Sequence, residues 1–182
     1  MAGARASYPV WDLLVRILHW ALAVSIALAW FTRTGFGRWH EWIGYASLAI
    51  VGLRVVWGAA GPPYARFVQF VRAPSAGLQY AVLALRGRAP RYIGHNPLGG
   101  WMVLALIVAV IAVGVSGWVY TTDAYWGEAW LEELHDLSAK ALLVLVALHV
   151  TGVIATSVLH RENLVAAMIH GRKLPPRQTD IG

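Results

Sequence analysis

The stretch LEELHDLSAKALLVLVALHVTGVIATSVLHR, Leu131–Arg161, decides the fold. It is long and apolar enough to cross a bilayer as one helix, because about 20 residues cover the hydrocarbon core. His135 and His149 lie within it, 149 − 135 = 14 residues apart. A helix rises about 1.5 Å and turns about 100° per residue, so the two side chains lie about 21 Å apart along the axis on nearly the same face. The pattern predicts two stacked sites joined by one helix.

The composition of the 182-residue chain indicates a membrane protein. Hydrophobic residues make up 58% of it and charged residues only 13%, which is too apolar for a soluble domain of this size. Cysteine is absent, which excludes disulfides, cysteinyl iron–sulfur clusters and covalent C-x-x-C-H haem attachment. The first apolar run is long enough to span the membrane, so we expect no cleavable signal peptide.

Four stretches of membrane-spanning length predict an all-α fold. We expect an integral membrane four-helix bundle that forms a single domain, residues 1–182, with two short interfacial helices in the loop between helices 2 and 3. The loop carries five arginines and no acid, and Pro74 separates its two amphipathic segments. In the tail, Glu162 and Asn163 are expected to cap a short helix that Gly171 ends. The predicted spans are 13–31, 39–60, 98–120 and 131–160, followed by a tail at 161–182.

The distribution of charge predicts the orientation. The N-terminal segment, which includes Arg5, the 61–97 connection and the tail hold most of the basic residues. The 121–136 connection holds five acidic residues and no Lys or Arg. The positive-inside rule therefore places both termini in the cytoplasm. We expect a multi-pass protein of the bacterial inner membrane, in contact with lipid.

This orientation places four histidines at two depths. His19 and His149 lie toward the cytoplasmic face, and His40 and His135 lie at the outer face. Each pair draws on two helices, as a porphyrin held edge-on in a bundle requires, and two imidazole ligands suit iron that moves electrons. The pairs therefore predict two haem b groups, an inner and an outer one, with His160 as a runner-up ligand for the inner iron.

Other interpretations of the histidines stay open. A lone membrane histidine often only hydrogen-bonds across helices. A structural zinc is less favoured because each depth offers only two histidines. Glu41 and Asp136 lie beside the outer pair, which leaves a mixed outer metal site open.

Several short motifs together resemble a known family. They are YPVWD at 8–12 leading to LHW at 18–20, RWHEWIG at 38–44, GHNPLGG at 94–100, LHD at 134–136 and HRENL at 160–164. In combination, over about residues 8–174, they resemble bacterial cytochrome b561, a group that includes the b-type cytochrome subunits of nickel–iron hydrogenases. The resemblance implies a di-haem b cytochrome that exchanges electrons with quinone. It matches the family's four ligand positions to His19, His40, His135 and His149.

Three further residues are candidate binding residues. Arg54 lies 14 residues after His40, and its charge calls for a partner such as an inner-haem propionate, or for snorkelling to the interface. Arg16 precedes His19 by about one turn and is a second candidate for a propionate. Asn96 is either a hydrogen-bond donor to a quinone at the cytoplasmic end or the cap of the helix that begins at Pro97.

These features predict a membrane protein that passes electrons between quinone and a redox partner, such as a cytochrome, a hydrogenase or a dehydrogenase subunit. One alternative is a superoxide:quinone oxidoreductase, in which Arg33 and Arg38 steer the anion to the outer haem. Another is a non-haem membrane scaffold or transporter. A homo-oligomer is compatible with the sequence, and no nucleic-acid partner is expected.

Overall fold

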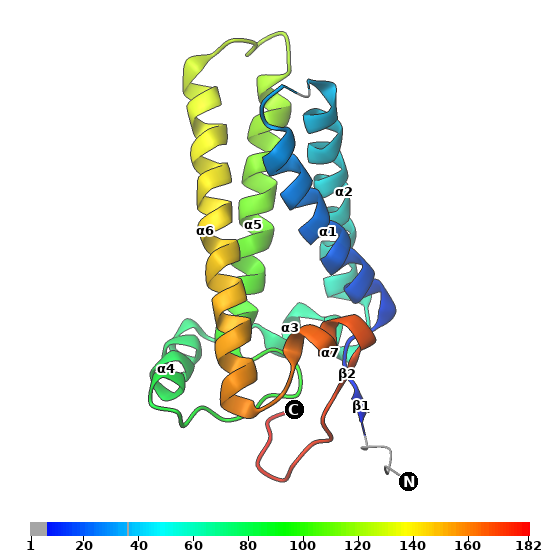
Figure 1. Ribbon diagram of the computed structural model, residues 1–182, viewed down its shortest axis with the longest axis vertical. Coiled ribbons are helices and arrows are strands. Elements are labelled where there is room, and N and C mark those ends of the chain that lie inside the picture. The colour runs from blue at the N-terminus through cyan, green and yellow to red at the C-terminus, as the bar shows by residue number, and fades with distance from the viewer. Residues whose placement is uncertain (1–6, 36) are drawn as a thin grey trace. The chain divides into compact units, whose positions relative to one another are not determined.

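The computed structural model describes residues 7–35 and 37–182 and is predominantly helical (Figure 1). Arg5, one of the basic residues used to predict the orientation, lies outside the described residues. The elements in chain order are β1 Tyr8–Pro9, α1 Leu13–Thr32, α2 Arg38–Ala60, η1 Pro63–Ala65, α3 Phe67–Phe70, α4 Pro74–Leu85, α5 Pro97–Tyr120, α6 Ala129–His160, α7 Leu164–His170 and β2 Arg172–Lys173.

The four predicted spans are confirmed as α1, α2, α5 and α6. Each is long and apolar enough to cross a membrane, and every predicted end lies within two residues of the observed one. The agreement follows from the length of the apolar runs. Helix-breaking residues such as Gly61 and Pro97 mark where these runs begin or end.

Short helices fill the connection between α2 and α5, as predicted. A 3-10 turn and the single turn of α3 precede α4, which begins at Pro74. Proline suits the first turn of a helix because its missing N–H has no partner there in any case. Val68 and Leu85 are 84% and 91% exposed, an apolar surface that suits helices lying at a membrane interface.

The predicted tail helix is α7. The Asn163 side chain accepts a hydrogen bond from the Ala166 N–H at 2.8 Å and caps its start. Gly171 ends it with a φ of 81°, in the left-handed region that favours glycine.

The described chain packs as two compact units, to which each of the four long helices contributes residues. The four-helix unit comprises Ile17–Val56 and Leu104–Ala147. Its buried cluster is formed by Val51, Val110 and Leu142, and Leu22 and Ile26 pack against them, so all four helices share one core. Many other large apolar side chains of this unit face outward, as a lipid environment allows.

The terminal unit comprises Met1–Arg16, Trp57–Val103 and Leu148–Gly182, of which residues 1–6 are not described. Here the segment that precedes α1 pairs with the tail. Strand β1 pairs antiparallel with β2, Tyr8 opposite Lys173 and Pro9 opposite Arg172. This short pairing was not expected from the sequence, because a strand of two residues is too short to show the alternating pattern of polar and apolar residues.

Candidate functional site

Two of the four predicted histidines come together in the four-helix unit. His40 lies in the first turn of α2 and His135 in the second turn of α6. Their ring centres are 6.1 Å apart and the ring planes lie at 87° to each other. Both side chains are half-buried. The structure therefore brings the two predicted outer ligands to one place.

Backbone carbonyls select the tautomer of both rings. The Nδ1 atom of His40 lies 3.0 Å from the Ala29 carbonyl oxygen, and that of His135 lies 3.0 Å from the Val113 carbonyl oxygen. A carbonyl oxygen only accepts hydrogen bonds, so each Nδ1 carries the proton and donates it. In the neutral form of either ring the lone pair is then on Nε2, and this is the form of histidine that binds a metal.

Helix α5 supports the His135 ring from one side. The Ser116 hydroxyl lies 3.2 Å from Nδ1 of His135 while it donates to the Val113 carbonyl at 3.0 Å. A Cβ at Gly117 would lie 2.9 Å from Cε1 of His135, which is closer than side chains normally approach. Glycine at 117 therefore leaves room for the ring to pack against the helix backbone.

The separation of the rings fits a pair of axial ligands. A metal–imidazole bond of about 2.0 Å, with about 1.1 Å more to the ring centre, places two imidazoles on opposite sides of one iron about 6.2 Å apart. The observed 6.1 Å is close to this value, so the two rings are near enough for both to reach one iron. Haem needs only these two protein ligands, since the porphyrin nitrogens supply the other four.

A metal site built from protein ligands alone is less well supported. Across residues 7–35 and 37–182, no three His, Cys, Asp or Glu side chains gather in a way that could hold a metal ion. Asp136, a possible third ligand beside the outer pair, forms an ion pair with Lys140 at 2.6 Å.

The two predicted inner ligands belong to different units. His19 lies on α1 in the four-helix unit and His149 on α6 in the terminal unit, and each is half-buried. Arg54 is half-buried on α2 in the four-helix unit. Arg16 lies in the terminal unit, and its Nη1 would be 2.9 Å from a Cβ at Gly171.

Asn96 caps α5, as one of its two predicted roles required. Its Oδ1 accepts a hydrogen bond from the Gly99 N–H at 2.7 Å, and its side chain also hydrogen-bonds Tyr80. The cap uses the side-chain oxygen, and one amide N–H donates to Tyr80, whereas a quinone carbonyl would be bound by the second amide N–H. The two roles are therefore compatible.

The terminal unit contains a buried group of charges that was not predicted from the sequence. Arg91, Glu162, Lys173 and Asp180 form three ion pairs, and every side chain is 3–5% exposed. Burial raises the pKa of Glu162, but its hydrogen bonds from Arg91 and the Leu174 N–H and the nearby cations outweigh this and lower the pKa below the ordinary value. Burial lowers the pKa of Lys173, against the opposing effect of Glu162.

A signal for this group was present in the sequence. The segments assigned to the cytoplasmic side contain only three acidic residues, Asp12, Glu162 and Asp180, among many basic ones. Asp12 accepts hydrogen bonds from the Val15 N–H and Trp57 Nε1, both at 3.1 Å, and the other two belong to the buried group. A rare acid among many cations is a good candidate for a specific partner.

Comparison with known proteins identifies a matching family and several relatives. The family model described as prokaryotic cytochrome b561 matches residues 10–171. Relatives include proteins named probable Ni/Fe-hydrogenase B-type cytochrome subunit. The protein from Bradyrhizobium diazoefficiens is 23% identical, over 94% of this chain and 88% of its own length. Those from Azotobacter vinelandii and Cupriavidus necator are each 24% identical, over 91% and 92% of this chain and 88% and 86% of their own lengths. No solved structure matches.

Proposed function

The chain belongs to the prokaryotic cytochrome b561 family, and on this premise we propose that it is a di-haem b cytochrome that transfers electrons between a redox partner protein and quinone. Family membership and the four membrane-length helices make it a multi-pass bacterial membrane protein and a b-type cytochrome that serves electron transfer. The number of haems, the ligands and the quinone are the proposal, and so is a single domain over residues 1–182.

The observation that carries the proposal is the pair of rings at the outer end of the four-helix unit. The 6.1 Å between the His40 and His135 ring centres would let both rings reach one iron, and their tautomer would offer Nε2 of each to it. Bis-imidazole haem supplies one-electron transfer when bound. The protein's own part is to orient both rings through the Ala29 and Val113 carbonyls and to surround them with apolar helices.

For the inner haem, the support comes from the sequence. His149 lies on the same face of α6 as His135, 14 residues further along, and His19 is the histidine that the orientation places at a matching depth. We propose these two as ligands of the inner iron. Arg16 and Arg54 are proposed as cationic partners of the haem propionates, because a guanidinium matches a carboxylate in charge and in hydrogen-bonding geometry.

The proposed quinone site lies beside Asn96. Quinone chemistry needs polar groups and access to protons, and the GHNPLGG segment provides an amide and a histidine at the start of α5. Since several relatives are named as hydrogenase subunits, we propose a hydrogenase or a similar dehydrogenase as the redox partner. We place the protein in the inner membrane with both termini in the cytoplasm, on the strength of its arginine distribution.

The test is a visible spectrum of the purified protein with haem counted per chain. We expect two haems of b type, both reduced by a chemical reductant and both reoxidised by a short-chain quinone analogue. One haem or none per chain would contradict the di-haem proposal. Rapid reduction by superoxide would instead favour the diffusible-substrate alternative.

A further inference from the structure

We propose that Arg91, Glu162, Lys173 and Asp180 form a positioning cluster that holds residues 92–96 in the geometry needed for quinone. The inference rests on the proposed function, because it takes the quinone to bind beside Asn96. It makes the C-terminal tail part of the quinone-reacting end, although the tail lies outside the four membrane helices. We refer to these four residues as the tail cluster.

Arg91 is the centre of the tail cluster, and its guanidinium is fully used. Its Nε and Nη2 donate to the two carboxylate oxygens of Glu162 at 3.2 and 2.8 Å. Its remaining N–H groups reach Asp180 and the carbonyls of Leu174 and Pro175, the last two at 2.9 and 3.5 Å. Five donors thus meet five acceptors, a geometry that the planar fork of arginine allows and lysine does not.

Lys173 attaches the same segment from the tail side. Its Nζ donates to the carbonyls of Tyr92 and Ile93 at 3.0 and 3.1 Å and lies 3.5 Å from Glu162. The backbone of Ile181 adds two hydrogen bonds, from its N–H to the Arg91 carbonyl at 2.9 Å and from the Ile93 N–H to its carbonyl at 3.0 Å. Side chains and backbone of the tail therefore fix residues 91–93.

The next three residues are the GHN of the GHNPLGG motif, and they are packed as tightly. A Cβ at Gly94 would lie 2.9 Å from Oε1 of Gln69. The His95 ring lies 4.7 Å from the Trp11 ring and 4.5 Å from the Phe70 ring, centre to centre. Asn96 then caps α5. A displacement of Arg91 would also shift the backbone of His95 and Asn96, because only four residues separate Arg91 from Asn96.

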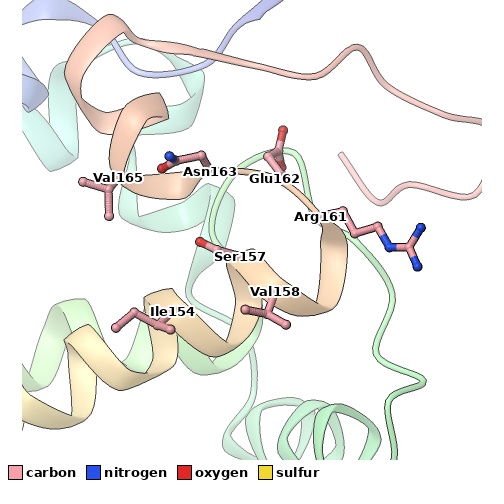
Figure 2. Close-up of a pocket in the computed structure, with 7 residues that line it drawn as sticks. All are labelled: Ile154, Ser157, Val158, Arg161, Glu162, Asn163 and Val165. Carbon is pink, nitrogen blue, oxygen red and sulfur yellow. The ribbon is translucent and has the colours of Figure 1, made fainter.

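The α6–α7 junction delivers Glu162 to the cluster. Arg161 has a φ of 53°, in the left-handed region, which ends α6 and turns the chain sharply. Figure 2 shows that Arg161 and Glu162 consequently point in different directions. They line a surface hollow of about 380 Å³ together with Ile154, Ser157, Val158, Asn163 and Val165. Ser157 and Asn163 both accept hydrogen bonds from backbone N–H groups at the start of α7, and these bonds stabilise the α6–α7 junction.

A purely stabilising role explains the cluster poorly. Desolvation of buried ions offsets most of their attraction, so apolar residues of similar volume often serve stability as well or better. What buried ion pairs provide is a defined arrangement, because each charge tolerates few positions. The arrangement defined here is that of the segment carrying His95 and Asn96.

The experiment compares Arg91→Lys with Arg88→Lys, an exposed arginine in the same connection, and Asp180→Ala with Asp180→Glu. Each full-length protein is reduced chemically and mixed with a short-chain quinone analogue. We expect Arg91→Lys and Asp180→Ala to keep both haem spectra and to raise the KM for the analogue about tenfold or more, since small misplacements of binding groups are costly. Arg88→Lys should react like the wild type, and Asp180→Glu should recover part of the loss.

The outcomes separate the inference from the proposed function. If the wild type reacts and Asn96→Asp slows it, but Arg91→Lys and Asp180→Ala keep wild-type KM values, the positioning role is overturned and the proposed function stands. If quinone does not reoxidise the wild type, the proposed quinone reaction and the positioning role are both contradicted. If Arg91→Lys does not fold, the full-length chain with Asp180→Ala carries the test alone, since it removes one acidic partner and keeps Arg91 paired with Glu162. Unchanged kinetics in that chain would equally overturn the inference.

Discussion

The His40 and His135 rings lie 6.1 Å apart, centre to centre, and each Nδ1 faces a carbonyl oxygen of a neighbouring helix at 3.0 Å. The carbonyls belong to Ala29 on α1 and Val113 on α5, so all four long helices contribute to this one pair. These two contacts orient both rings and select the Nδ1–H tautomer of each. Under the proposed function, both rings would offer Nε2 to one iron at this end of the four-helix unit.

Ligand substitutions should remove one haem at a time. We expect His40→Ala or His135→Ala to lose the outer haem and keep the inner one, and His19→Ala or His149→Ala to do the reverse. The measurement is haem per purified chain together with the visible spectrum. His170→Ala, at an exposed histidine, is the control and should retain two haems. Loss of both haems in every variant would mean that the sites are not independent.

The contact between Gly117 and His135 gives a second prediction. The methyl group of Gly117→Ala would lie 2.9 Å from Cε1 of His135, so the ring has to move, and such overpacking typically costs about 1–3 kcal/mol. We expect weaker binding of the outer haem and an altered spectrum for that haem alone. Gly52→Ala on α2 is the matched control, because nothing lies within 4 Å of its added Cβ. Wild-type haem content and spectrum in Gly117→Ala would contradict this packing.

The orientation gives a third prediction. A reporter enzyme fused after Gly182 should give a cytoplasmic signal, and one inserted near Tyr125 a periplasmic signal. The reason is the contrast between the basic 61–97 connection and the acidic 121–136 connection. The reverse pattern of signals would exchange the inner and outer assignments of the haems.

The long helices were predictable because apolar length and helix-ending residues depend on the local sequence alone. The 32 residues of α6 and the Asn163 cap are examples. That His40 and His135 lie near each other was predictable for a similar reason, since counting along helices that alternate in direction places both residues near the same end of the four-helix unit. The role of the Ala29 and Val113 carbonyls was not predictable, because every residue has a backbone carbonyl and the sequence does not indicate which of them faces a histidine.

The tail cluster could not be paired from the sequence. Arg91 and Glu162 lie 71 residues apart, and Arg91 and Asp180 lie 89 apart. No helical or strand period connects such positions, and five arginines in the connection were equal candidates. Only the path of the tail, which returns to pair with residues 91–93, distinguishes Arg91 from its neighbours.

The ionisation of Glu162 makes stability depend on pH. The pKa of this carboxyl is held below its ordinary value of 4.5, so it binds protons less readily in the folded chain than in the unfolded one. It therefore stabilises the fold above that pH, and the contribution is lost as the pH falls through the lower, folded-state pKa. Thermal unfolding in detergent should show Glu162→Gln at least about 5 °C below the wild type at neutral pH.

In acid this difference should shrink, because the wild-type carboxyl becomes neutral as the glutamine already is. Arg91 keeps its charge throughout this range, and the comparison of wild type with Glu162→Gln cancels the other groups that titrate, so the change reports Glu162. A difference that stays constant from neutral pH to well below 4.5 would show that Glu162 contributes through shape and not through charge.

The last prediction separates the two roles of Asn96. Its Oδ1 caps α5 through the Gly99 N–H, and only its amide N–H would serve a quinone carbonyl. Asn96→Asp keeps an acceptor for the cap and removes the donor, whereas Asn96→Leu removes both and should also lose about 1 kcal/mol of cap stabilisation. We expect both variants to bind two haems that a chemical reductant still reduces, and both to be reoxidised more slowly by a quinone analogue. Wild-type reoxidation of Asn96→Asp, or an analogue that perturbs only the outer-haem spectrum, would move the quinone site to the opposite face.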